Sequence, residues 1–185
     1  MQHRLTTPVT PDLLAPLRAG DTVLLSGTVY TARDAAHKRM MELLDNGQPL
    51  PFPIEGSALY YVGPTPERPG EVIGSAGPTT SGRMDSYSPR LLSLGQSIMI
   101  GKGARNHAVQ KAVVENGAVY LAALGGAGAL MAASVASLEI VCWEDLGCEA
   151  VRKLTVKDFP LTVILDTHGG NLYESGPAAY LASLQ

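Results

Sequence analysis

SIMIGKGARNHAVQKAVVENGAVYLA, the stretch from Ser97 to Ala122, decides the fold class. Its first four residues are suited to a buried strand. The segment Asn106–Asn116 has apolar residues at helical spacing and is closed by Gly117. Ala118–Ala122 then returns as a second strand rich in apolar residues. The stretch therefore predicts a strand–helix–strand unit, which is typical of an α/β fold.

Further elements on both sides of this unit alternate in the same way. Apolar and β-branched runs predict strands, and capping residues followed by helical spacing predict helices. The predicted strands are Asp21–Tyr30, Ala58–Val62, Val72–Ala76, Leu138–Trp143, Val151–Val156 and Leu161–Asp166. The predicted helices run from an N-cap at Thr31 to Asn46, from Pro89 to Leu94 and from Ala129 to Ser134. With no internal repeat, the pattern predicts one mixed-sheet α/β domain over residues 1–185.

The composition excludes several classes of function. Of the 185 residues, 45% are hydrophobic and 17% charged, which is typical of a globular protein. A net charge of −3 and an aromatic content of 5% disfavour a nucleic-acid surface. No apolar run approaches membrane-spanning length, and residues 1–8 lack the apolar core of a signal peptide. We therefore expect a cytoplasmic protein without nucleic-acid or membrane partners.

The chain has too few metal-binding side chains for a site of its own. Cys142 and Cys148 are its only cysteines, too few to hold an iron–sulfur cluster. We expect both to be small buried residues. The histidines show no spacing typical of ligands; they are His3, His37, His107 and His168. The sequence predicts no metal site made only of this chain.

The segment Gly77–Asp85, GPTTSGRMD, is the strongest candidate for chemistry. Its glycines and proline predict a shaped loop rather than a strand or helix. Thr79, Thr80 and Ser81 offer adjacent hydroxyls, and Arg83 offers a planar fork suited to a carboxylate. Such a loop can hold an oxyanion. The alternative is an ordinary turn whose hydroxyls cap the next helix.

Two more cations follow predicted strands. Arg33 stands in the first turn of a predicted helix, where a cation normally needs an anion nearby. Lys102 lies between two glycines at the end of a strand, where open α/β sheets bind ligands. The residues around Lys102 do not meet the phosphate-loop pattern, and the later Gly-Gly-x-Gly does not match the dinucleotide fingerprint. A solvated surface position remains the alternative for Arg33.

Taken together, these motifs resemble the C-terminal region of class I fumarases. In two-subunit members, such as L(+)-tartrate dehydratase, this region is a separate β subunit. The resemblance covers nearly the whole chain, and its most specific parts are the Thr-Thr-Ser-Gly-Arg-Met-Asp and Arg-Asp-Ala-Ala-His runs. The matching segments are Gly27–Lys38, Gly77–Asp85, Ile100–Gly103, Gly125–Ala129 and Trp143–Gly147.

The resemblance implies a swivelling β/β/α fold and a hydro-lyase activity on a 2-hydroxy dicarboxylate. It also implies a [4Fe-4S] cluster that is held by an α subunit and acts as a Lewis acid on the leaving hydroxyl. The expected partners are that α subunit, in an α2β2 hetero-oligomer, and a small dicarboxylate.

Site residues carry over from the family one by one. Arg33, Arg83 and Lys102 match its substrate-binding cations, and Thr79 and Thr80 match its paired threonines. The resemblance makes Thr79 the candidate catalytic base. His37, Lys38 and Asp85 stand beside these motifs and are interpreted as surface or loop-fixing groups, outside the site.

Two other functions stay open on the sequence alone. One is a non-catalytic regulatory module that binds a dicarboxylate through the same loop. The other is a subunit of the aconitase type, against which the Gly77–Asp85 run argues.

Overall fold

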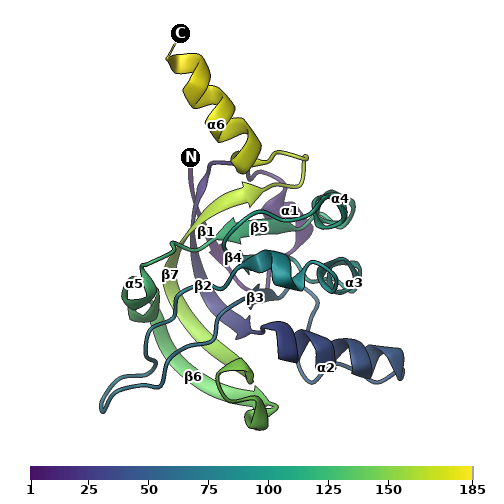
Figure 1. Cartoon of the computed structure of the whole chain (residues 1–185), viewed down its shortest axis with the longest axis vertical. Helices are drawn as coiled ribbons and strands as arrows, with labels where there is room; N and C mark the ends of the chain where they lie inside the picture. The colour runs from purple at the N-terminus through teal and green to yellow at the C-terminus, as the bar shows by residue number, and fades with distance from the viewer. Residues whose placement is uncertain (185) are drawn as a thin grey trace.

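The fold, seen in a computed structural model that describes residues 1–184, is built around one mixed β-sheet with helices on its outside (Figure 1). Gln185, the last residue of the predicted domain range, lies outside the described residues. The predicted α/β fold is confirmed. Within residues 1–184 the strands are β1 (Gln2–Thr6), β2 (Thr22–Thr31), β3 (Ala58–Tyr60), β4 (Ile98–Gly101), β5 (Val119–Ala122), β6 (Val135–Cys142) and β7 (Val151–Leu165). The helices are α1 (Pro11–Leu14), α2 (Asp34–Asp45), α3 (Ser88–Ser93), α4 (His107–Glu115), α5 (Gly128–Ala133) and α6 (Leu172–Ser183), with 3-10 turns η1 (Ser81–Met84) and η2 (Glu144–Glu149).

The first five strands are parallel to their neighbours, in the order β1-β2-β3-β4-β5. The stretch Ser97–Ala122 forms β4, α4 and β5, as its pattern predicts. Asn106 caps α4 by accepting a hydrogen bond from the Val109 N–H at 3.0 Å. Because parallel strands end at the same edge, the segments that follow β2, β3 and β4 meet there.

Strand β7 closes the sheet. It runs antiparallel to β2, β5 and β6, so β2, β3, β4, β5 and β7 form a closed ring of paired strands. The prediction of two strands, Val151–Val156 and Leu161–Asp166, is wrong because the chain continues through the intervening residues as one strand. The register against β2 shifts between Leu25 and Gly27, which leaves only residues 157–158 out of the pairing, and Asp158 takes a left-handed conformation with φ 49°.

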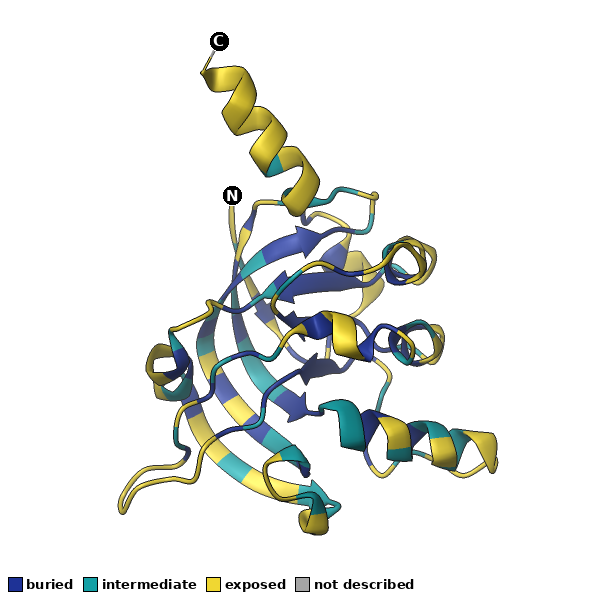
Figure 2. Cartoon of the chain, in the orientation of Figure 1, coloured by how far each residue is buried: buried dark blue, intermediate teal, exposed yellow. Residues whose placement is uncertain are grey.

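Buried residues line the strands of the ring (Figure 2). Side-chain alternation along the strands divides the apolar residues into two cores. Ile98 and Ile100 of β4 point into the ring, where they pack with residues such as Phe159. Met99 points to the other face and packs under α2, α3 and α4. The buried helix residues on that face include Ala36, Met40, Leu91, Leu92, Val109 and Val113. The ring and its helical layer together hold the strand ends in fixed positions.

One predicted strand and one predicted helix start are wrong for identifiable reasons. Residues 72–76 form no strand, because Ser75 exchanges hydrogen bonds with Thr65 and the Ala76 N–H binds the Gly128 carbonyl. Thr31 does not cap a helix, because it is the last residue of β2 and its hydroxyl bonds to the backbone of Ala150 and Arg152. The N-cap of α2 is Arg33.

The sequence patterns also missed elements near both ends of the described chain. Strand β1 pairs with β2, and α6 extends away from the sheet with mostly exposed residues (Figures 1 and 2). Among residues 1–184, no helix has both the length and the apolar character needed to cross a bilayer.

Candidate functional site

The proposed cations and threonines come from three segments at one edge of the sheet. Arg33 follows β2, the threonines and Arg83 lie in the segment after β3, and Lys102 follows β4. These three strands are parallel neighbours, so their carboxyl ends lie side by side. The structure therefore brings the three segments to the edge where open α/β sheets bind ligands.

The threonine segment extends the sheet beyond its regular strands. Thr79 donates its backbone N–H to the Tyr61 carbonyl at 2.7 Å, and Ser81 donates to the Lys102 carbonyl at 2.8 Å. Thr80 and Lys102 form an isolated parallel bridge. The hydroxyl of Thr80, at the N-cap position of η1, makes no capping hydrogen bond. The simple helix-capping alternative therefore fails for Thr80.

Ser81 differs from the two threonines because its side chain is buried. Its Oγ lies 2.9 Å from the hydroxyl of Tyr120, which in turn lies 2.9 Å from the Gly103 carbonyl oxygen. Of the three adjacent hydroxyls that the sequence offers, that of Ser81 is therefore buried and turned to Tyr120 instead of a ligand. Thr79 is half-buried and Thr80 exposed, so the segment presents two hydroxyls and anchors itself with the third.

A buried ion pair lies beneath this segment. Arg105 has no exposed side-chain surface, and its Nε donates to Asp85 Oδ1 at 2.5 Å. The other carboxylate oxygen of Asp85 accepts the Asn106 N–H at 2.7 Å, and Arg105 Nη2 donates to Ser88 Oγ at 2.7 Å. Burial of both charges is tolerated because each is hydrogen-bonded. Asp85 is thus a loop-fixing group, as the sequence indicated.

Sequence reasoning missed Arg105. The available signal was that Arg105 follows Lys102 closely in the sequence, while Asp85 had no predicted ion-pair partner. Burial cannot be read from that signal, since arginine is mostly exposed in proteins.

The two site arginines share one carboxylate. Arg83 Nε lies 2.8 Å from Asp34 Oδ1, and Arg33 Nε lies 4.0 Å from Asp34 Oδ2. Arg33 Nη2 also lies 3.3 Å from Glu149 Oε1. Arg33 occupies the N-cap rather than the first turn of α2, which corrects its predicted position by two places. Asp34 and Glu149 supply the anions that a cation at a helix N-terminus needs.

His37 is buried directly behind Arg33, so its interpretation as a surface or loop group needs correction. Its Nδ1 lies 2.8 Å from the Arg33 carbonyl oxygen, and its ring packs against Tyr61 and Tyr87. Burial lowers the pKa of His37 from 6.5 to about 4. The neutral ring donates from Nδ1 and helps to fix the start of α2. Lys38, the other residue set aside, is exposed.

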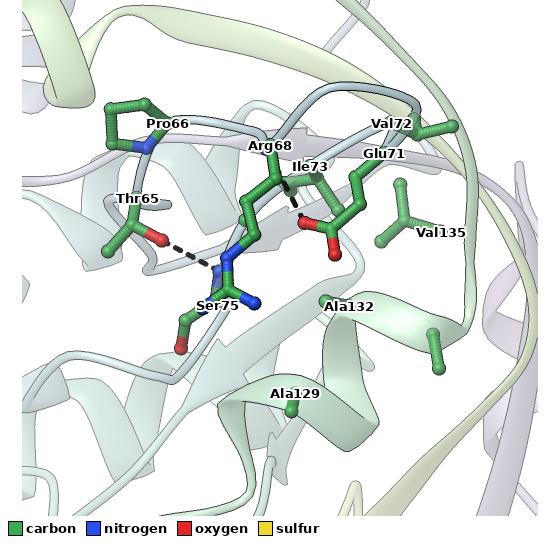
Figure 3. Close-up of a pocket in the computed structure, with 12 residues that line it drawn as sticks. Thr65, Pro66, Arg68, Glu71, Val72, Ile73, Ser75, Ala129, Ala132 and Val135 are labelled. Atoms are coloured by element: carbon green, nitrogen blue, oxygen red, sulfur yellow. Dashed lines mark hydrogen bonds between the residues drawn. The ribbon is translucent and has the colours of Figure 1, made fainter.

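A cavity of about 470 Å³ has a different set of lining residues, which Figure 3 shows in close-up. It is bordered by the loop from Thr65 to Ser75 and by Ala129 and Ala132 of α5. None of the five predicted site residues lines it. The candidate site is instead an open surface at the strand ends, with Arg83 and Lys102 exposed.

The cysteines do not fit an iron–sulfur cluster. Cys142 is half-buried, Cys148 is exposed, and the expectation that both are buried is therefore wrong. Burial raises the pKa of the Cys142 thiol to about 11, which disfavours the thiolate that binds metals. Within residues 1–184, no group of three His, Cys, Asp or Glu side chains could hold a metal ion. Two cysteines in the sequence are too few to ligate a four-iron cluster.

Comparison with known proteins identifies the family. The model of the family described as Fumarase C-terminus matches residues 2–176. The chain belongs to this family. A putative L(+)-tartrate dehydratase subunit beta from Methanocaldococcus jannaschii is 41% identical over 164 residues, covering 85% of this chain and 84% of that protein. The L(+)-tartrate dehydratase subunit beta of Escherichia coli K12 is 35% identical over 177 residues, covering 93% and 87%.

Longer relatives in the same family contain this region as one part. Fumarate hydratase 2 of Leishmania major is 39% identical over 183 residues, which are 92% of this chain and 32% of that protein. The aerobic class I fumarate hydratase of Escherichia coli K12 is 42% identical, and the match covers 28% of it. The chain therefore spans about a third of the fumarate hydratases that it matches.

Proposed function

We propose that this chain is the β subunit of an iron–sulfur hydro-lyase that reversibly dehydrates a 2-hydroxy dicarboxylate of the malate or tartrate type. The observation that carries the proposal is the match to tartrate dehydratase β subunits over 84% and 87% of their length. In this proposal residues 1–185 form one domain. The chain joins an α subunit in an α2β2 assembly in the cytoplasm.

The chain's own contribution is to bind and orient the substrate. Arg33, Arg83 and Lys102 bind the two carboxylates, and Thr80 donates a hydrogen bond to the substrate. Thr79 removes the proton next to a carboxylate. Its hydroxyl is a weak base, and nearby cations favour its deprotonated form. The same cations stabilise the extra negative charge that develops when the proton leaves.

The cluster belongs to the α subunit in this proposal. The support from this chain is that its cysteines, one half-buried and one exposed, do not provide a ligand set. The open shape of the candidate site also supports a shared site, since a second protein surface would enclose the substrate and exclude water.

The test is co-purification of the chain with its α partner under anaerobic conditions. The assembled complex should interconvert one pair from a panel of malate with fumarate, tartrate with oxaloacetate, and a methylated analogue. The chain alone should be colourless, iron-free and inactive. An iron-loaded chain with a cluster absorption band would contradict the division between subunits, and an inactive complex with a full cluster would contradict the activity.

The same purified proteins, the chain alone and the complex, can also distinguish the enzyme from a regulatory module. A module should bind a dicarboxylate tightly without a partner, whereas half of a shared site should bind weakly until the α subunit is added. Calorimetric titration of succinate into the chain alone and into the complex makes this comparison.

A further inference from the structure

Glu149 uses both of its carboxylate oxygens near the candidate site. Oε1 lies 3.3 Å from Arg33 Nη2, and Oε2 accepts the backbone N–H of Ala35 at 2.9 Å. The side chains of Arg33 and Glu149 are 18% and 21% exposed, so this pair is shielded more than a surface ion pair. One carboxylate therefore holds the guanidinium and the first turn of α2 at the same time.

The turn that carries Glu149 is itself held in place. Arg152 of β7 donates from Nη2 to the Gly147 carbonyl at 2.8 Å and from Nη1 to the Cys148 carbonyl at 3.1 Å. On the other side, the Ala150 carbonyl accepts the Thr31 hydroxyl at 3.3 Å. The carboxylate is thus presented from a fixed backbone rather than from a free loop.

Gly63 lies against the Arg33 side chain. A Cβ on Gly63 would lie 2.6 Å from Arg33 Nη1 and 3.3 Å from Arg33 Cδ, so a larger residue there would displace the guanidinium. Gly63 therefore leaves room for the guanidinium, and Glu149 determines its direction. The contact with Glu149 is an ion pair at 3.3 Å between two partly buried side chains, so solvent and salt screen it less than an exposed pair.

The contacts form a row of alternating charges, Glu149, Arg33, Asp34 and Arg83. The distances along the row are 3.3 Å, 4.0 Å and 2.8 Å. If Glu149 loses its charge, Arg33 has Asp34 as its remaining carboxylate partner in the described chain and competes with Arg83 for it. The orientation of both arginines therefore depends on Glu149.

We propose that Glu149 is a positioning residue that orients Arg33, and through Asp34 also Arg83, toward a substrate carboxylate. This inference rests on the proposed function, in which both arginines bind the substrate. Glu149 itself does not touch the substrate.

Glu149→Gln in the assembled α–β complex tests the proposal. Glutamine can still accept the Ala35 N–H but has no charge for Arg33. We expect KM to rise at least roughly fivefold with kcat changed less than about twofold, as for lost substrate binding. Glu144→Gln is the matched control, because Glu144 is an exposed carboxylate of the same turn and loses the same charge.

A double-mutant cycle shows whether Glu149 acts through Arg33. In an Arg33→Ala background, Glu149→Gln should add little to the loss of kcat/KM, because the group that it orients is gone. Independent, multiplying effects would overturn the proposal, as would a Glu149→Gln variant with the kinetics of Glu144→Gln. A fall in KM would also overturn it, since Glu149 would then be a competitor of the substrate.

Two further measurements keep the result clear. Glu149→Asp keeps the charge and should recover part of the KM effect, which a loss of folding in Glu149→Gln could not explain. The affinity of the complex for succinate should fall in the same variants in which KM rises. If the wild-type complex has no hydro-lyase activity, the proposed function fails, and the succinate titration still decides whether Glu149 orients the anion site.

Discussion

Gly101 ends β4 directly against Ser81, so close that a Cβ on Gly101 would overlap Ser81 Oγ and lie 3.0 Å from Tyr61 Cδ2. This contact packs the segment that contains Thr79 and Thr80 against the end of the sheet. We predict that Gly101→Ala destabilises the chain by about 1–3 kcal/mol, the usual cost of overpacking. Thermal unfolding of the purified chain measures the effect.

Ser81→Ala in the same variant should recover part of the lost stability, because it removes the overlapping oxygen. Gly176→Ala is the control, since a Cβ there would meet only Leu172 at 3.6 Å inside α6. An unchanged melting temperature for Gly101→Ala would contradict the close packing of Gly101 against Ser81.

Arg83→Lys should reduce kcat/KM of the assembled enzyme at least roughly tenfold, about 1.4 kcal/mol. Arg83 forms an ion pair with Asp34 through Nε, at 2.8 Å, which leaves its two terminal nitrogens for a substrate carboxylate. A lysine has one nitrogen and cannot make both contacts with the same geometry. Steady-state kinetics should show normal values for the control Arg90→Lys, an exposed arginine of α3 that pairs with Asp45. Unchanged kinetics for Arg83→Lys would remove Arg83 from the site.

Thr79→Val separates a catalytic hydroxyl from a structural one. The anchor of Thr79 in the sheet is its backbone N–H, which bonds to the Tyr61 carbonyl at 2.7 Å and survives the substitution. We therefore expect the melting temperature to stay within a few degrees while kcat falls much more than KM rises. A near-normal kcat would refute the role of base, and a group on the α subunit would become the candidate.

His37 should make the folded state sensitive to acid. Its pKa is about 4 in the folded chain, below the ordinary 6.5 of an unfolded chain. The unfolded state therefore binds a proton first as the pH falls, so the contribution of His37 is complete above 6.5 and is lost toward 4. The loss should be about 1.4 kcal/mol for each pH unit within this window.

Urea unfolding of wild type and His37→Asn at several pH values measures this contribution. Asparagine keeps a donor for the Arg33 carbonyl but does not titrate, so the stability difference between the two proteins should shrink as the pH falls from 6.5. His107→Asn, at an exposed position of α4, controls for the loss of an imidazole. A difference that is constant with pH would contradict the buried neutral state.

Local sequence patterns correctly predicted the elements that are specified by residues close together in the sequence. The cap at Asn106 and the helical spacing after it specify α4, and the apolar run at 98–100 specifies β4. Strand β7 was predicted as two pieces because the residues around Asp158 break the pattern, whereas pairing with β2 continues on both sides of them. Distant pairing outweighs local preference there.

The sequence predicted only those residues of the candidate site that lie within its recognisable motifs. Thr80 and Lys102 were named separately, and only the structure brings them into one bridge. Arg105 and Glu149 stand outside the motifs. The unassigned cation for Asp85 was a signal for Arg105, but neither its burial nor the contacts of Glu149 can be read from the neighbouring residues. Glu149 accepts from Ala35, a residue 114 positions away, and contacts of that kind leave no periodic signal in a sequence.

The pairing of β7 with β2, β5 and β6 gives the chain a high contact order. Domains dominated by such distant pairings fold slowly, because the cost of closing long loops precedes the gain from the contacts. During synthesis from the N-terminus, Arg33 and Lys102 leave the ribosome before β7. The ring of strands that supports them therefore cannot close until β7 has also emerged. A product truncated before Val151 would carry every proposed substrate-binding residue and lack the strand that closes the ring beneath them.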